Sequence, residues 1–112
     1  ALTTRRFGEL AEEVYELSNS EAMEALGKEF RTPGHIPLCR ESPGGLSKRQ
    51  GHTELAVAIA RLSGNIPCTI GAEMLDPDGD GALSLQEARK YAEEHGIPMI
   101  TGNDIMESMD MV

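Results

Sequence analysis

The chain has 112 residues, enough for one hydrophobic core but not for two, and 39% of them are hydrophobic. Its formal net charge of −9 repels a phosphate backbone, so we expect no general binding of nucleic acids. The longest apolar stretch, residues 55–62, is too short to span a bilayer, and no signal peptide opens the sequence. Two distant cysteines, Cys39 and Cys68, indicate neither a disulfide framework nor a zinc site. We therefore expect a cytoplasmic protein that binds no membrane.

The first third of the chain is predicted to form two helices. Apolar residues recur at three- and four-residue steps over residues 7–17, as on one face of an amphipathic helix. Ser18-Asn19-Ser20 breaks that helix and offers a cap for a shorter one, whose apolar positions fall within residues 22–26. Residues 35–39 then form a short extended segment that Pro37 limits.

The rest of the chain is predicted to alternate between helix and strand. A helix over residues 53–63 is apolar nearly all round, which indicates burial, and Gly64 stands where a C-terminal cap is expected. The elements that follow are a strand at 66–75, a helix from the Ser84–Glu87 capping box to His95, closed by Gly96, a strand at 97–101 and a helix at 104–109. This alternation predicts an α/β fold, a mixed sheet with packed helices and some parallel pairing, with residues 1–112 as a single domain.

The loop at residues 76–87, DPDGDGALSLQE, has the ligand order of an EF-hand calcium loop. An EF-hand also needs a helix that enters the loop, whereas the preceding segment has the pattern of a strand. A solvated turn, in which Ser84 and Glu87 cap the next helix, explains the same residues. A calcium-binding interaction module is therefore kept as the alternative function.

Chemistry-bearing residues concentrate at Lys48–Glu54, where a loop with two cations and Gly51 runs into a helix N-terminus. The first turn of a helix presents unpaired N–H groups and a partial positive charge, which suit a phosphate or carboxylate. Arg49 offers a bidentate contact to a phosphate, and the hydroxyl of Thr53 offers another donor. An equally simple interpretation makes Thr53 an N-cap and leaves the cations solvated.

Three histidines and one glutamate are candidates for further roles. His52, beside Arg49, is a candidate metal ligand or acid/base group, and His35 is a weaker one. His95 at a helix C-terminus complements the helix dipole without further function. Glu73 falls near the C-terminal end of an expected strand, where α/β proteins commonly place site residues, although an exposed Glu there needs no function.

Several motifs follow one another in the order RTPGHIPLCR (31–40), PGGL (43–46) and RQGHTELAVAIARLSG (49–64), and then come AEM (72–74) and a D-G-x-x-S turn into a helix. This succession resembles the 3,4-dihydroxy-2-butanone-4-phosphate synthase family of the riboflavin pathway. The opening ALTTRRFGELAE resembles the archaeal branch of that family. The match covers essentially the whole chain, but only about the C-terminal half of the family's domain. Its most specific parts are the R-x-G-H-T-E and R-x-P-G-H runs.

The resemblance implies a lyase that converts D-ribulose 5-phosphate to L-3,4-dihydroxy-2-butanone 4-phosphate and formate with magnesium or manganese. By position, His35 and Glu73 would be catalytic and move protons during enolisation and rearrangement, and Glu73 would also contact the substrate. His52 would ligate the metal. Adjacent residues would bind the substrate, mainly through its phosphate, namely Arg49, Gln50, Gly51 and Thr53, and His52 would also contact the substrate.

The chain departs from the family pattern in two places. The family's acidic loop, which contributes an Arg, a second metal-binding Glu and an Asp, belongs to the N-terminal half and has no counterpart here. Ala72 stands before Glu73, where family members often have Cys. We therefore expect the chain to be one part of a synthase, inactive alone, that is completed by an N-terminal half or in a homodimer. A catalytically inactive relative that keeps the phosphate site is the remaining alternative.

Overall fold

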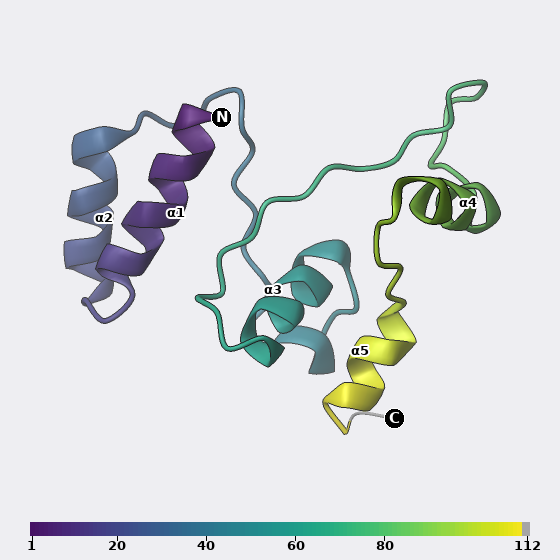
Figure 1. The fold of residues 1–112 in the computed structure, drawn as a ribbon. Helices are drawn as coiled ribbons and strands as arrows, with labels where there is room; N and C mark the ends of the chain where they lie inside the picture. Colours follow the sequence, from purple (N-terminus) through teal and green to yellow (C-terminus); the bar gives the residue numbers. More distant parts are fainter. Residues whose placement is uncertain (111–112) are drawn as a thin grey trace. The chain divides into compact units, whose positions relative to one another are not determined.

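The computed structural model describes residues 1–110, and its regular structure is helical. The elements in chain order are α1 (Leu2–Val14), α2 (Asn19–Glu29), the 3-10 turn η1 (Gly45–Ser47), α3 (His52–Leu62), α4 (Leu85–His95) and α5 (Gly102–Ser108) (Figure 1). None of these helices is long and apolar enough to cross a membrane. The chain divides into two compact units, Ala1–Ile70 and the part from Gly71 onward, and each is described by itself.

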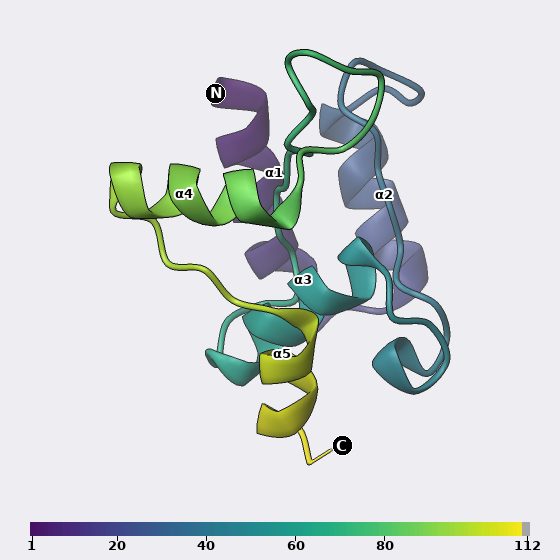
Figure 2. The same ribbon diagram turned by 90° about the vertical axis from the view of Figure 1, so that its right-hand side faces the viewer.

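The first unit opens with a helical hairpin in which α1 and α2 lie side by side (Figures 1 and 2). The rings of Phe7 and Phe30 meet edge to face with centroids 5.7 Å apart, an arrangement that aromatic quadrupoles favour. Leu10 is buried in the hairpin. Arg6 donates hydrogen bonds to the carboxylates of both Glu13 and Glu29, and thereby links the two helices.

The turn between the two helices confirms the predicted cap. Ser18 Oγ accepts a hydrogen bond from the N–H of Glu21, whose carboxylate accepts one from the N–H of Ser18 at 3.0 Å. This reciprocal capping box satisfies backbone donors that the first turn of a helix leaves without a partner. A local sequence signal therefore decides where α2 begins.

In the rest of the first unit, a loop is held against α3. Leu46 in η1 is buried, as are Ala58 and Ala60 of α3. Arg61 near the end of α3 donates to both carboxylate oxygens of Glu41 in the loop, one of them at 2.9 Å. This fork-to-fork ion pair lowers the pKa of Glu41 and fastens the start of the loop to the helix.

The second unit contains α4 and α5. Ser84 Oγ caps α4 by accepting from the N–H of Glu87, and Gly96 ends the helix in the left-handed region at φ 63°, as predicted. Thr101 caps α5 in a capping box with Asp104. The buried apolar side chains of this unit are those of Ala92 and Ile105.

The prediction of an α/β fold with a mixed sheet is wrong. Neither residues 66–75 nor residues 97–101 form a strand, and the β pairing among the described residues is one antiparallel bridge between Leu75 and Ala82. A β-branched segment becomes a strand only when a neighbour satisfies its backbone donors and acceptors, and two-stranded pairs alone are marginal in water. No other described segment offers such an edge. Large apolar side chains in both segments consequently stay exposed, including those of Ile70 and Ile100.

The burial predicted for helix α3 holds only in part. Ala58 and Ala60 are buried, whereas Ile59 and Leu62 remain exposed. The helix itself and its start within one residue of the prediction are confirmed. Periodicity gives the helix, but the number of faces that are covered depends on the layers packed around it.

We expect Ser18→Ala to lower the free energy of unfolding by about 1 kcal/mol, because the first turn of α2 loses its side-chain acceptor. Ser20→Ala is the matched control, since Ser20 lies within α2 and does not cap it. Urea unfolding followed by far-ultraviolet circular dichroism measures both. Equal effects of the two substitutions would contradict a capping role for Ser18.

Candidate functional site

Helix α3 begins without a side-chain cap. Gly51 is its N-cap residue and makes no side-chain cap hydrogen bond. The interpretation of Thr53 as an N-cap is therefore wrong, because Thr53 is the second residue inside the helix. Helices α2, α4 and α5 are each capped by a Ser or Thr. The first turn of α3 thus keeps backbone donors available to an anion.

One carboxylate lies directly behind this helix start. The side chain of Glu54 is 1% exposed. Its Oε1 accepts a hydrogen bond from the N–H of Ser42 at 2.8 Å, and its Oε2 accepts one from Nη1 of Arg49 at 2.9 Å. The Ser42 N–H is the main cause that lowers the pKa of Glu54 to about 2; the N–H of Glu54 itself and the charge of Arg49 add to it, and burial opposes them.

Glu54 stands within the R-x-G-H-T-E run without a predicted role, and Ser42 is not among the predicted site residues. Burial and a partner twelve residues away in the chain are not visible in a sequence pattern. The available signal was an acidic residue in the first turn of an apolar helix, five residues after an arginine. Such a residue is favoured by the helix dipole and lies within reach of the arginine.

Gly51 lies closely packed against these groups. A Cβ atom at Gly51 would lie 2.5 Å from Nη1 of Arg49 and 2.7 Å from Oε2 of Glu54. Its φ of −95° suits any residue, so the constraint is steric. Arg49 passes over the backbone at this point, while its side chain as a whole stays 62% exposed.

The other predicted site residues are only partly brought together. Gln50 and His52 follow Arg49 at the start of α3, and both are exposed. His35 lies exposed in the loop after α2, and the structure shows no hydrogen bond that joins it to the described residues near Arg49. Glu73 is exposed and belongs to the second unit. The structure therefore unites Arg49, Gly51 and Glu54, and leaves the catalytic assignments of His35 and Glu73 as predictions.

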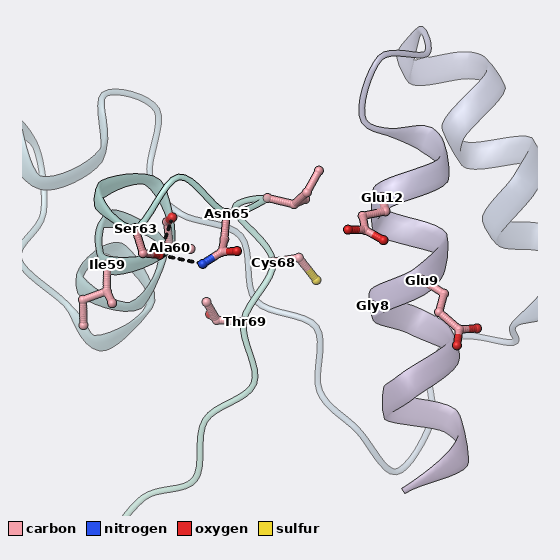
Figure 3. Close-up of a pocket in the computed structure, with 10 residues that line it drawn as sticks. Gly8, Glu9, Glu12, Ile59, Ala60, Ser63, Asn65, Cys68 and Thr69 are labelled. Carbon is pink, nitrogen blue, oxygen red and sulfur yellow. Dashed lines mark hydrogen bonds between the residues drawn. The ribbon is translucent and has the colours of Figure 1, made fainter. Parts of the chain in front are cut away.

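A hollow in the first unit lies elsewhere. Figure 3 shows it between α1, which contributes Gly8, Glu9 and Glu12, and the segment after α3, which contributes Asn65 and Cys68. Two glutamates line it without a cation, so it does not suit a phosphate. Burial raises the pKa of the Cys68 thiol. None of the predicted site residues lines this hollow.

The calcium loop lacks half of its expected framework. Residues 66–83 contain no helix, so the loop has an exiting helix, α4, but no entering one. Asp76 Oδ1 instead accepts from the N–H of Asp78, and the N–H of Asp76 donates to the carbonyl of Gly81. Within residues 1–110, no group of three His, Cys, Asp or Glu side chains is arranged to hold a metal ion. Ser84 at the end of this stretch caps α4.

Comparison with known proteins matches the chain to one family. The sequence profile of the 3,4-dihydroxy-2-butanone 4-phosphate synthase family matches residues 6–108. A synthase of that name from Methanosarcina mazei is 44% identical over 108 residues, and another from Archaeoglobus fulgidus is 43% identical over 107 residues. A riboflavin biosynthesis protein RibBA from Chlamydia muridarum is 37% identical over 82 residues. The chain therefore belongs to the 3,4-dihydroxy-2-butanone 4-phosphate synthase family.

The match covers a large share of this chain but a small share of its relatives. It covers 96% of this chain but 42% of the Methanosarcina mazei synthase and 43% of the Archaeoglobus fulgidus synthase. For the Chlamydia muridarum protein the shares are 73% and 19%. The chain thus spans less than half the length of the curated relatives that it matches.

We expect the carboxyl of Glu54 to titrate with a pKa of about 2, against about 4.3 in the unfolded chain. Because the folded pKa is the lower one, this stabilisation is present above pH 4.3 and is lost as the pH falls toward 2. A carbon-detected NMR titration measures the pKa, and urea unfolding at several pH values measures the stability. Glu54→Gln should remove this part of the pH dependence. A Glu54 carboxyl that titrates at its unfolded value would contradict the hydrogen bonds described.

We expect Gly51→Ala to displace the Arg49 side chain from Glu54, because the added Cβ overlaps the guanidinium. The cost to the free energy of unfolding should be about 1 kcal/mol, since Ala is also a poorer N-cap than Gly. Gly71→Ala is the control, because a Cβ there meets open space. Urea unfolding compares them, and a Gly51→Ala chain as stable as Gly71→Ala would argue against the close packing.

Proposed function

We propose that the chain is the phosphate-binding part of a 3,4-dihydroxy-2-butanone 4-phosphate synthase of riboflavin biosynthesis. The proposed reaction converts D-ribulose 5-phosphate to L-3,4-dihydroxy-2-butanone 4-phosphate and formate. One observation carries this proposal: in a chain of net charge −9, the uncapped start of α3 combines backbone donors with the guanidinium of Arg49. Membership of the family indicates which substrate to propose, and the start of α3 offers donors for the phosphate of that substrate.

The phosphate would be bound by the residues at the start of α3. The N–H groups of His52 and Thr53 lie in the uncapped first turn, and Arg49 adds a charged donor beside them. Gln50 and the hydroxyl of Thr53 offer further donors in the same stretch. A doubly charged phosphate is stabilised there by the helix dipole and by charge-assisted hydrogen bonds.

We assign proton transfer to His35 and Glu73. Enolisation of a ketose phosphate needs a base to remove a proton next to the carbonyl, and an acid to return one later. An imidazole and a carboxylate are the side chains that most often serve in this way. Both residues are exposed, so both are accessible to a substrate.

The family's divalent metal is not accommodated by the described residues alone. His52 would be one ligand, but magnesium and manganese prefer several oxygen ligands. Residues 1–110 bring no three suitable side chains together. We therefore propose that the missing ligands come from a second polypeptide, either the remaining part of the family's domain or a second copy.

The proposal is tested with a chimera in which this chain replaces the matching part of the Methanosarcina mazei synthase. We expect the chimera to release formate from D-ribulose 5-phosphate with magnesium, and the chain alone to release none. Arg49→Ala should lower kcat/KM by about 10- to 100-fold, because a charged hydrogen bond to the phosphate is lost. His52→Ala should lower it at least as much.

Two surface variants serve as controls. Lys90→Ala removes a cation from α4, and His95→Ala removes an exposed imidazole from the same helix. Both should leave kcat/KM within about twofold, as surface substitutions usually have small effects. A folded chimera that binds substrate but releases no formate would favour a catalytically inactive relative. Turnover by the chain alone would refute the need for a second polypeptide.

A further inference from the structure

Glu54 is the one charged residue that is buried among the described residues. Burial of a carboxylate is costly unless hydrogen bonds and opposite charge compensate for it. A stable helix start does not require such a group, because the side-chain oxygens of Ser18, Ser84 and Thr101 perform the capping elsewhere in the chain. The buried carboxylate therefore calls for an explanation other than capping.

The two oxygens of Glu54 act on different partners. Oε1 holds the backbone N–H of Ser42, so it fixes the loop that precedes α3. Oε2 holds Nη1 of Arg49, so it fixes the direction of a long side chain that would otherwise sample many rotamers. One contact engages Nη1 only, and the guanidinium has five N–H donors in all. Because the Arg49 side chain stays 62% exposed, its other donors remain open to a ligand.

We propose that Glu54 is a positioning residue of the anion site: it holds Arg49 by one edge of the guanidinium, so that the opposite edge is preorganised for a phosphate at the start of α3. Fixing the side chain before binding removes an entropic cost that the ligand would otherwise meet. The inference rests on the proposed function, since it concerns the phosphate that function implies. It adds Glu54, a residue for which no role was predicted from the sequence.

The geometry also explains why Arg49 would have to be an arginine. A planar fork can contact a carboxylate with one edge and an anion with the other, whereas a lysine ammonium is a single point of charge. Gly51 fits the same arrangement, because its missing side chain leaves the space in which the guanidinium passes. These residues therefore form one structural unit around the guanidinium, made of Arg49, Gly51 and Glu54.

The test is a double-mutant cycle that measures the affinity of the folded chain for inorganic phosphate by phosphorus NMR. Glu54→Gln keeps a carbonyl oxygen for the Ser42 N–H but loses the charge that holds Arg49. We expect it to weaken phosphate binding about fivefold, and Arg49→Ala to weaken it about tenfold or more. In the Arg49→Ala background, Glu54→Gln should cause no further loss, because there is no longer a guanidinium to position.

Glu41→Gln is the matched control. Glu41 also joins the loop to α3 through an arginine, Arg61, but it does not contact Arg49. We expect this variant to lose stability while its phosphate affinity stays unchanged. An equal loss of affinity in Glu41→Gln and Glu54→Gln would show that Glu54 acts only through the stability of the loop, and would overturn the inference.

Arg49→Lys provides a second measurement if Glu54→Gln does not fold, since it keeps a positive charge beside the buried Glu54 carboxylate. We expect Arg49→Lys to lose about as much affinity as Arg49→Ala, because Glu54 engages the single ammonium. A Lys variant with the original affinity would overturn the inference and leave the proposed function standing. If the unmodified chain binds no phosphate, the proposed site at α3 is itself wrong, and the positioning role is wrong with it.

Discussion

The start of α3 depends on how one buried carboxylate is compensated. The carboxylate of Glu54 is buried away from solvent, and hydrogen bonds from the Ser42 N–H and from Arg49 replace those it would make with water. A charge in this position is tolerated only while those partners stay in place. The requirement works in both directions: the carboxylate holds the loop and the arginine, and these two keep the carboxylate ionised. These mutual contacts set the local geometry of the loop, of Gly51 and of the start of α3.

Charge distribution explains why an anion would bind at this place and not elsewhere in the first unit. The chain carries 19 acidic residues against 10 lysines and arginines, so most of its surface repels phosphate. The hollow beside α1 is lined by Glu9 and Glu12. At the start of α3, by contrast, the Glu54 carboxylate is buried and paired with Arg49, while the Arg49 side chain is mostly exposed and the helix has no side-chain cap. The local arrangement of charges at the start of α3 therefore favours an anion although the net charge of the chain is negative.

Local sequence signals predicted the helices well and the sheet poorly. Ser18, Ser84 and Gly96 were each expected at a helix end and are found there, because capping depends on atoms within a few residues. Residues 66–75 have the composition of a strand but remain unpaired. Pairing needs an edge that no described segment supplies.

The sequence by itself determined the family, through the R-x-P-G-H and R-x-G-H-T-E runs, and it placed the candidate anion site at residues 49–53. It also determined most helix ends, since these are local. Only the tertiary structure decided that Gly51 is the N-cap, that Thr53 lies inside the helix, and that Glu54 is buried. The reason is physical: burial and the contact with Ser42 arise when the loop folds back on α3, and no window of sequence contains that event.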